Sequence, residues 1–108
     1  MSRVLLDECV PRRLARDFPA DTVSHVCDLG WQGLRNGRLL AVMREAQIAV
    51  LVTVDRNLSF QQNIGASGIA VIVLHAPSNR RTDLQPLIAS IMDLLPAVQA
   101  GQVYRLGA

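Results

Sequence analysis

The sequence contains no lysine, and its 11 basic side chains are all arginine. Without lysine, the chain cannot form a phosphate-binding loop of the GxxxxGK[ST] type, in which the lysine reaches the phosphates. Arginine is the better bidentate partner of phosphate, but a genome biased toward arginine codons would give the same composition. The absence of lysine therefore serves best as an exclusion.

Aromatic residues and long apolar runs are also scarce. Phe, Trp and Tyr make up 4% of the chain, so we expect recognition of bases by stacking to be weak. No apolar run approaches the roughly 20 residues that cross a bilayer, and the N-terminus lacks a signal-peptide pattern. We therefore expect a cytoplasmic protein with no membrane partner, in which Cys9 and Cys27 are reduced thiols.

What is present is the composition of one globular domain. The chain has 108 residues, of which 50% are hydrophobic and 19% charged, and this length suffices for one hydrophobic core but not for two. The formal net charge of +2 is too small to indicate a nucleic-acid-binding protein by itself. We expect a single domain over residues 1–108.

Short apolar runs alternate with stretches of helical periodicity. We predict strands at residues 4–6, 22–26, 50–54 and 69–74 and an edge strand at 102–106, with helices at 11–18, 36–46, 60–64 and 84–98. Strands that are apolar throughout indicate a parallel sheet, because helices cover both of its faces. The expected fold is a three-layer α/β/α sandwich with a mainly parallel central sheet, although the last strand could pair antiparallel.

Prolines and polar residues mark the expected helix ends. Pro11 suits the first turn of the first helix, and Asn36 could cap the second. Thr82 with Gln85 resembles a capping box at the start of the last helix. Pro96 is expected to break or kink the end of that helix.

Acidic side chains follow three of the predicted strands. Asp7 and Glu8 come directly after the first strand, Asp28 follows the second, and Asp55 follows the third. The carboxyl ends of parallel strands meet at one edge of a sheet, where ligand sites form. Two unit charges roughly 4 Å apart repel by about 4 kcal/mol at an effective dielectric of 20. Such a cluster therefore needs a cation, an arginine partner or a raised pKa.

A divalent cation would solve this repulsion. Carboxylate oxygens in a half-open site suit Mg²⁺ or Mn²⁺, and the ion could bind a phosphodiester and lower the pKa of a water molecule. Alternatively, each acid caps a helix or pairs with arginine. Zinc is a further hypothesis for Cys9, His25 and Cys27, which lie near two strand ends. No fourth ligand is evident, however, and cysteine often serves as a small hydrophobic residue.

Arginines follow the first acids within two helical turns, at Arg12, Arg13 and Arg16. They could hold phosphate groups beside the acids, or they could form a solvated helix face. Arg35 and Arg56 lie in predicted loops or helix starts, where a path for RNA could run. The basic side chains alone leave both interpretations open.

Two other classes of α/β protein also use aspartates at strand ends, and both fit poorly. A phosphoacceptor receiver domain needs a lysine late in the chain, which is absent. A haloacid-dehalogenase-type phosphatase needs Asp-x-Asp after its first strand, whereas this chain has Asp7-Glu8-Cys9.

Three segments carry a resemblance to a known family. They are residues 4–8 with 11–14 (VLLDE, PRRL), residues 30–40 (GWQGLRNGRLL), and residues 51–58 with 61–63 (LVTVDRNL, QQN). Together they resemble the small stand-alone PIN-like domains of bacteria and archaea, over nearly the whole chain. The resemblance implies a three-layer α/β/α fold and a metal-dependent ribonuclease with one or two Mg²⁺ or Mn²⁺ ions. It also implies the role of toxin in a toxin–antitoxin pair.

The resemblance further implies roles for individual residues. Asp7 and Asp55 stand at the metal-ligand positions of the first and third strands, and Asp28 could be a further ligand. Glu8 and Asn36 would support catalysis; PIN nucleases usually carry an acid at the position of Asn36. The residues expected to contact RNA are Arg12, Arg13, Arg35, Arg56 and Asn57.

Two functional hypotheses follow. In the first, the protein is a PIN-like ribonuclease whose substrate is RNA and which a cognate antitoxin protein could control; it could also form a homodimer. In the second, the fold is kept but the site no longer cleaves, which leaves a module that binds RNA or a partner protein. The second is motivated by Asn36, which stands where an acid is usual.

Overall fold

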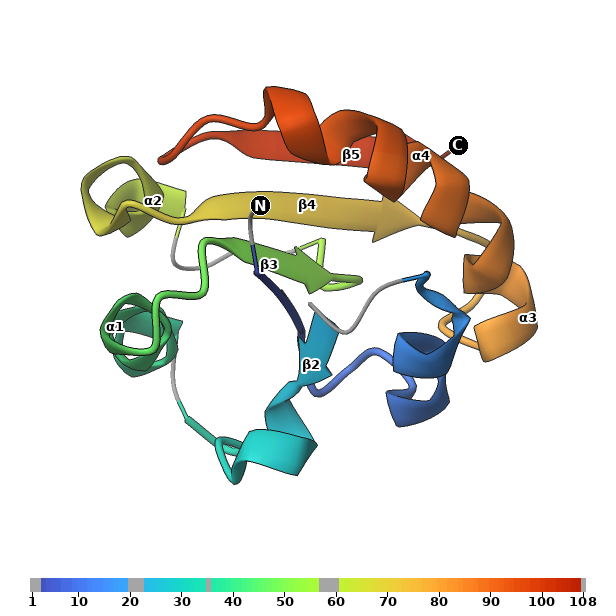
Figure 1. Ribbon diagram of the computed structural model, residues 1–108, viewed down its shortest axis with the longest axis horizontal. Coiled ribbons are helices and arrows are strands. Elements are labelled where there is room, and N and C mark those ends of the chain that lie inside the picture. The colour runs from blue at the N-terminus through green and yellow to red at the C-terminus, as the bar shows by residue number, and fades with distance from the viewer. Residues whose placement is uncertain (1–2, 20–22, 35, 57–60, 108) are drawn as a thin grey trace.

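A five-stranded sheet, in which all strands run parallel, forms the centre of the protein (Figure 1). Its strands are β1 (Val4–Leu6), β2 (Val23–His25), β3 (Val50–Thr53), β4 (Ala70–His75) and β5 (Val103–Gly107), in the spatial order β2-β1-β3-β4-β5. The computed structural model describes residues 3–19, 23–34, 36–56 and 61–107. The predicted α/β class is confirmed, and β5 pairs parallel to β4, not antiparallel.

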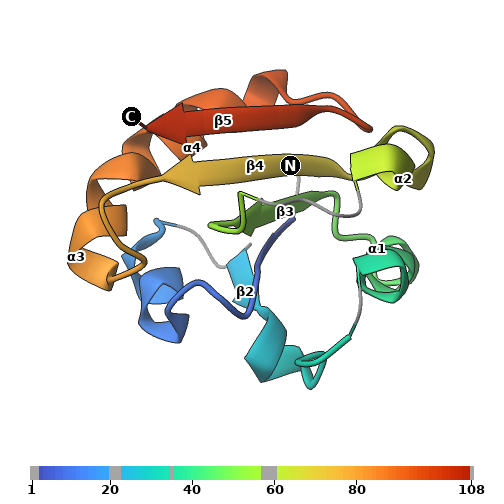
Figure 2. The same cartoon turned by 180° about the vertical axis from the view of Figure 1, so that it is seen from behind.

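Helices cover both faces of the sheet (Figures 1 and 2). One face carries the 3-10 helix η1 (Arg12–Asp17), then α3 (Arg81–Leu84), η3 (Gln85–Leu87), α4 (Ile88–Leu94) and η4 (Leu95–Ala97). The other face carries η2 (Val26–Leu29), α1 (Asn36–Glu45) and α2 (Gln61–Ser67). Among the described residues, no helix is long and apolar enough to cross a membrane.

The strands are apolar on both faces because each face has its own hydrophobic core. Val4 and Leu6 of β1 pack on the η1 and α4 side, whereas Leu5 packs on the α1 side. The same alternation continues through β3 and β4, so both strands are buried along almost their whole length. This two-sided burial is typical of parallel sheets, and it explains why the strands were recognisable as continuous apolar runs.

Several helices differ from the sequence prediction. The helix predicted at 84–98 is divided into short α and 3-10 segments, with Pro86 in η3 and Pro96 in η4, because proline cannot donate a backbone hydrogen bond. Thr82 is not a cap: α3 begins at Arg81, and its N-cap is Arg80. The second strand ends at His25, since the His25 ring accepts the amide of Cys27 and starts η2.

The strand order places a topological switch point between β1 and β3. From β1 the chain crosses to β2 on one side, and after β2 it returns to β3 on the other side of β1. Figure 2 shows that the arrowheads of β3, β4 and β5 point to one edge of the sheet. In open α/β sheets, ligands bind outside the carboxyl ends of the strands at such a point.

Helix η1 is fixed to the rest of this edge by an ion pair. The Arg81 guanidinium donates two hydrogen bonds to the Asp17 carboxylate, with Nε–Oδ2 at 2.7 Å and Nη2–Oδ1 at 2.6 Å. Gln85 Nε2 donates a third hydrogen bond to the same carboxylate, at 3.1 Å. The hydrogen bond from Arg81 lowers the pKa of Asp17. The last residue of η1 is thereby joined to α3 and η3.

This ion pair predicts a pH-dependent contribution to stability. Because the pKa of Asp17 is lowered in the folded state, the stabilisation is present above its unfolded pKa and is lost as the pH falls through the folded value. Asp17→Asn should therefore reduce the urea midpoint at pH 7, and the difference should shrink below about pH 4. The exposed Asp93→Asn is the matched control. If the urea midpoints of Asp17→Asn and the unmodified chain differed by the same amount at pH 7 and below pH 4, the lowered pKa of Asp17 would not contribute to stability.

The two-sided core predicts a second effect on stability. Leu51 of β3 is 1% exposed, so Leu51→Ala should lower the free energy of unfolding by about 2–5 kcal/mol, because it leaves a cavity in a close-packed core. Leu29→Ala removes the same atoms at a position that is 38% exposed and should cost about 1 kcal/mol or less. Urea denaturation measures both, and equal losses would argue against the observed burial.

Candidate functional site

Asp7 is the first polar residue after β1, at the switch point. Its backbone amide still donates to the carbonyl of Val52 at 2.9 Å, so the ladder with β3 holds it in place. The carboxylate accepts two hydrogen bonds from neutral donors: Oδ1 from the amide of Glu8 at 2.9 Å, and Oδ2 from Thr53 Oγ1 at 2.8 Å. Oδ2 also accepts from the thiol of Cys9 at 3.6 Å, so Oδ1 is the oxygen that keeps a second lone pair for a ligand.

Thr53 connects the two acids that the sequence singled out. It ends β3 and is completely buried. Its hydroxyl donates to Asp7 and accepts the backbone amide of Asp55 at 3.1 Å. One buried hydroxyl thus orients the carboxylate of Asp7 and fixes the start of the segment that carries Asp55. Sequence reasoning missed Thr53, although a hydroxyl at the end of an apolar strand, two residues before Asp55, was a usable signal.

A thiol completes this cluster. Cys9 Sγ lies 3.4 Å from Thr53 Oγ1 and 3.6 Å from Asp7 Oδ2. Burial raises the pKa of Cys9, and the nearby charge of Asp7 raises it further. The thiol is therefore protonated at neutral pH and can act as a weak donor to these oxygens. We call Asp7, Cys9, Thr53 and Asp55 the switch-point cluster.

The loops around the cluster are held to one another. Glu8 Oε1 accepts the amide of Gly33 at 3.2 Å, which ties the loop after β1 to the loop after η2. Asn79 Nδ2 donates to the carbonyl of Cys9 at 3.3 Å, and Arg56 Nη2 donates to the carbonyl of Ala76 at 3.2 Å. The segments after β1, β3 and β4 therefore stay side by side beyond the sheet. Arg56 also lines a cavity of about 240 Å³ between the last two of them.

The acids predicted at this edge separate into two groups. Asp7 and Asp55 follow the neighbouring strands β1 and β3 and are joined through Thr53. Asp28 lies in η2 and forms an ion pair with Arg12 of η1. Among the described residues, no group of three or more His, Cys, Asp or Glu side chains is arranged to hold a metal ion. The ligand roles of Asp7, Asp55 and Asp28 stay predictions.

The donor chemistry of the cluster nevertheless suits a hard cation. Asp7 and Asp55 are carboxylates, and Mg²⁺ and Mn²⁺ prefer carboxylate oxygens as ligands. Mg²⁺ commonly keeps several water molecules and uses only one or two carboxylates. Two acids are therefore enough for an ion that also binds the phosphate of a substrate.

Other predicted residues have varied positions. Arg13 is exposed and has no hydrogen bond or ion pair within the described residues. Asn36 begins α1, but its side chain lies outside the described part of the structure, as do residues Arg35 and Asn57. Their expected roles stay predictions from the sequence.

The two histidines are not part of the cluster's contacts. His25 is fully buried; its Nδ1 accepts the amide of Cys27 at 3.0 Å, and its Nε2 lies 2.6 Å from the carbonyl of Val10. Both ring nitrogens are therefore used within the protein, which argues against zinc at Cys9, His25 and Cys27. His75 Nε2 is buried and has no hydrogen-bond partner among the described residues.

Comparisons with known proteins identify no relative. The chain matches no protein-family model, no curated protein and no solved structure.

The linking role of Thr53 is testable by stability. Thr53→Val keeps the shape of the side chain but removes the hydroxyl, which leaves the amide of Asp55 without this acceptor and removes one of the donors to Asp7. We expect a loss of about 1–3 kcal/mol in the free energy of unfolding, measured by urea denaturation. Thr53→Ser keeps the hydroxyl and should retain most of the stability. If valine were tolerated as well as serine, the hydroxyl would not be what holds the cluster.

Proposed function

We propose that the protein is a PIN-like, metal-dependent endoribonuclease whose active site is the switch-point cluster. The observation that carries the proposal is the bridge made by Thr53, which joins the carboxylate of Asp7 to the backbone of Asp55 at the carboxyl ends of β1 and β3. The resemblance of residues 4–8 and 51–58 to PIN-like domains agrees with the same two acids as metal ligands.

In this proposal Asp7 and Asp55 hold Mg²⁺ or Mn²⁺, as one ion or two. The bound ion would lower the pKa of a water molecule and stabilise the charge on the phosphate during an in-line displacement. Thr53 would keep the carboxylate of Asp7 in one orientation, since its hydroxyl donates to Oδ2. Glu8, in the loop after β1, and Asn36, the first residue of α1, are assigned supporting roles from the sequence.

Arginine side chains would position the RNA on either side of the acids. Arg12 and Arg13 belong to η1, which follows β1, and Arg56 follows β3. Arg35 and Asn57 are assigned the same role from the sequence alone. Contacts of this kind go to phosphates and fix the position of the strand without reading its sequence.

The proposal extends to partners and cellular context by the family resemblance. We propose a cytoplasmic toxin that is controlled by a cognate antitoxin protein and that could also form a homodimer. Net charge gives little attraction to RNA at long range, because the chain carries only +2. Local arginines must therefore supply most of the electrostatic affinity.

A binding module without cleavage is the alternative function. Two features favour it: an asparagine begins α1 at a position where PIN nucleases usually carry an acid, and Asp28 is engaged by Arg12. Fewer carboxylates at the switch point would weaken the hold on a divalent ion. Such a protein would bind RNA or a partner protein through the same edge of the sheet.

Cleavage of RNA distinguishes these two functions. The purified full chain, with Mn²⁺ or Mg²⁺ and a panel of single-stranded RNAs, should cleave, and EDTA should stop the reaction. Asp7→Asn keeps an acceptor for Thr53 but removes the charge, so the rate should fall roughly a hundredfold or more. Asp93→Asn makes the same change at an exposed position of α4, and this variant should cleave as the unmodified chain does.

Calorimetric titration with Mn²⁺ completes the test. Binding that is lost in Asp7→Asn and kept in Asp93→Asn supports the metal site. RNA binding without cleavage, together with no Mn²⁺ binding at millimolar concentration, favours the binding module. Cleavage that survives Asp7→Asn at full rate would overturn the proposed site.

A further inference from the structure

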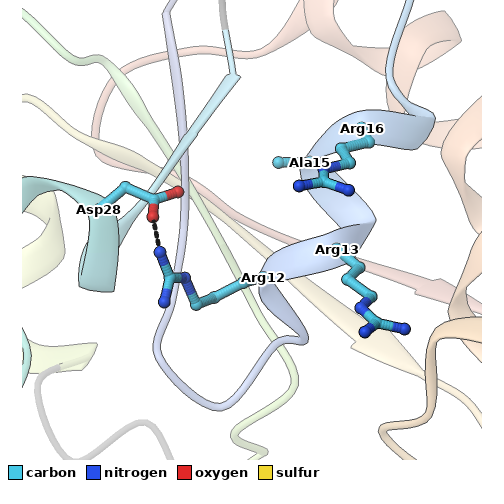
Figure 3. Close-up of a pocket in the computed structure, with 5 residues that line it drawn as sticks. All are labelled: Arg12, Arg13, Ala15, Arg16 and Asp28. Carbon is cyan, nitrogen blue, oxygen red and sulfur yellow. Dashed lines mark hydrogen bonds and ion pairs between the residues drawn. The ribbon is translucent and has the colours of Figure 1, made fainter.

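A second feature of the same edge is a cleft between η1 and η2. It is lined by Arg12, Arg13, Ala15, Arg16 and Asp28 and has a volume of about 410 Å³ (Figure 3). We call it the arginine cleft. Arg12 extends across it to Asp28, whereas Arg13 points away from that pair (Figure 3). Three of its five lining residues carry a positive charge, and one carries a negative charge.

The positive charges of the cleft are incompletely compensated. Arg12 pairs with Asp28, but Arg13 and Arg16 have no hydrogen bond or ion pair within the described part of the chain. The Arg12–Asp28 pair is itself open to solvent, with 63% and 47% of the two side chains exposed. Ion pairs so exposed contribute little to stability, so this pair can open at little cost when another anion arrives.

The element that presents these arginines is firmly held. Leu14 of η1 is fully buried in the core, and Phe18, the residue that follows the end of η1, is also buried. Asp17 is bound by Arg81 and Gln85 on the α3 side, so this carboxylate is not available to Arg13 or Arg16. The buried side of η1 thus anchors the helix, and its arginines lie on the side exposed to solvent.

The chemistry of the cleft suits phosphate. A guanidinium presents a planar set of donors that matches the oxygens of phosphate or carboxylate. The Asp28 carboxylate already occupies such a position on Arg12. We propose that the arginine cleft is a phosphate-binding subsite, in which Asp28 competes with the phosphate for Arg12. In this view Asp28 restrains anion binding and is not a metal ligand.

The location of the cleft indicates which phosphate it would hold. The switch-point cluster lies at the ends of β1 and β3, whereas the cleft lies between the segments that follow β1 and β2. The cleft and the switch-point cluster share no residue, so we assign to the cleft a phosphate other than the one bound at Asp7 and Asp55. Taking RNA as the source rests on the proposed function, and the subsite would then hold a backbone phosphate beside the cleaved bond. A free phosphate or a mononucleotide has the same binding chemistry.

RNA binding without metal tests the subsite separately from catalysis. Fluorescence anisotropy would measure the binding of a labelled single-stranded RNA, in EDTA, to the full chain and to the variants Arg16→Gln, Arg44→Gln and Asp28→Asn. Arg16→Gln should weaken RNA binding about five- to tenfold. It should also reduce the slope of the logarithm of the binding constant against the logarithm of the salt concentration by about one. Arg44→Gln removes the same charge at the end of α1 and should bind as the unmodified chain does.

Asp28→Asn gives the sharper result. Because it frees Arg12 and removes a negative charge, it should tighten RNA binding about two- to fivefold. Calorimetry with Mn²⁺ on the same variant should show unchanged metal affinity. Weaker RNA binding, or loss of Mn²⁺ binding, would overturn the competitor role of Asp28.

Inorganic phosphate and a mononucleotide identify the source of the anion. Weakening of RNA binding in Arg16→Gln but not in Arg44→Gln supports an RNA subsite. Phosphate binding that Arg16→Gln abolishes, with RNA affinity unchanged, supports a subsite for a small phosphate compound and removes RNA as its ligand. Equal behaviour of Arg16→Gln and Arg44→Gln toward every anion would overturn the subsite. Because no arm depends on cleavage, an inactive nuclease would not affect the outcome.

Discussion

Burial of β1 on both faces is the constraint on which the rest of the structure depends. A strand with a neighbour on each side and a hydrophobic core above and below favours apolar side chains, because a buried polar side chain needs a hydrogen-bond partner. Val4, Leu5 and Leu6 meet this requirement, and the first polar side chain can follow only where the strand leaves the sheet. Asp7 is that residue, and its amide is still in the ladder with Val52. The position of the candidate site is thus set by packing.

The acids of this edge differ in what neutralises them. Asp17 is held by the bidentate guanidinium of Arg81, and Asp28 is paired with Arg12. Within the described part of the chain, Asp7 has only neutral donors: a hydroxyl, an amide and a thiol. Its negative charge is oriented but not cancelled. An anion held in this way remains able to attract a cation, which supports Asp7 as the centre of the proposed metal site.

The strands, and the edge of the sheet at which the acidic residues follow them, could be predicted from the sequence. Burial on both faces makes each strand a continuous apolar run, which is visible in the local sequence. The sequence was not sufficient for the contacts made at this edge. Thr53 meets Asp7 across 46 residues of sequence, and the pairing of Arg12 with Asp28 depends on how η1 and η2 face each other. The last helical stretch was located correctly and its change at Pro96 was expected, but its apolar periodicity gave no sign of the 3-10 segment around Pro86.

Charge along the edge links the two proposals. The arginine cleft lies on the β2 side of Asp7, and Arg56 lies toward β4. An RNA strand that contacts both the arginine cleft and Arg56 would pass the carboxylates of Asp7 and Asp55. Without a cation, these carboxylates repel the phosphates of the RNA. A divalent ion reverses the sign of that interaction, so ion and RNA should each strengthen the binding of the other. Asp28 acts against the binding of RNA, because its carboxylate occupies the guanidinium of Arg12.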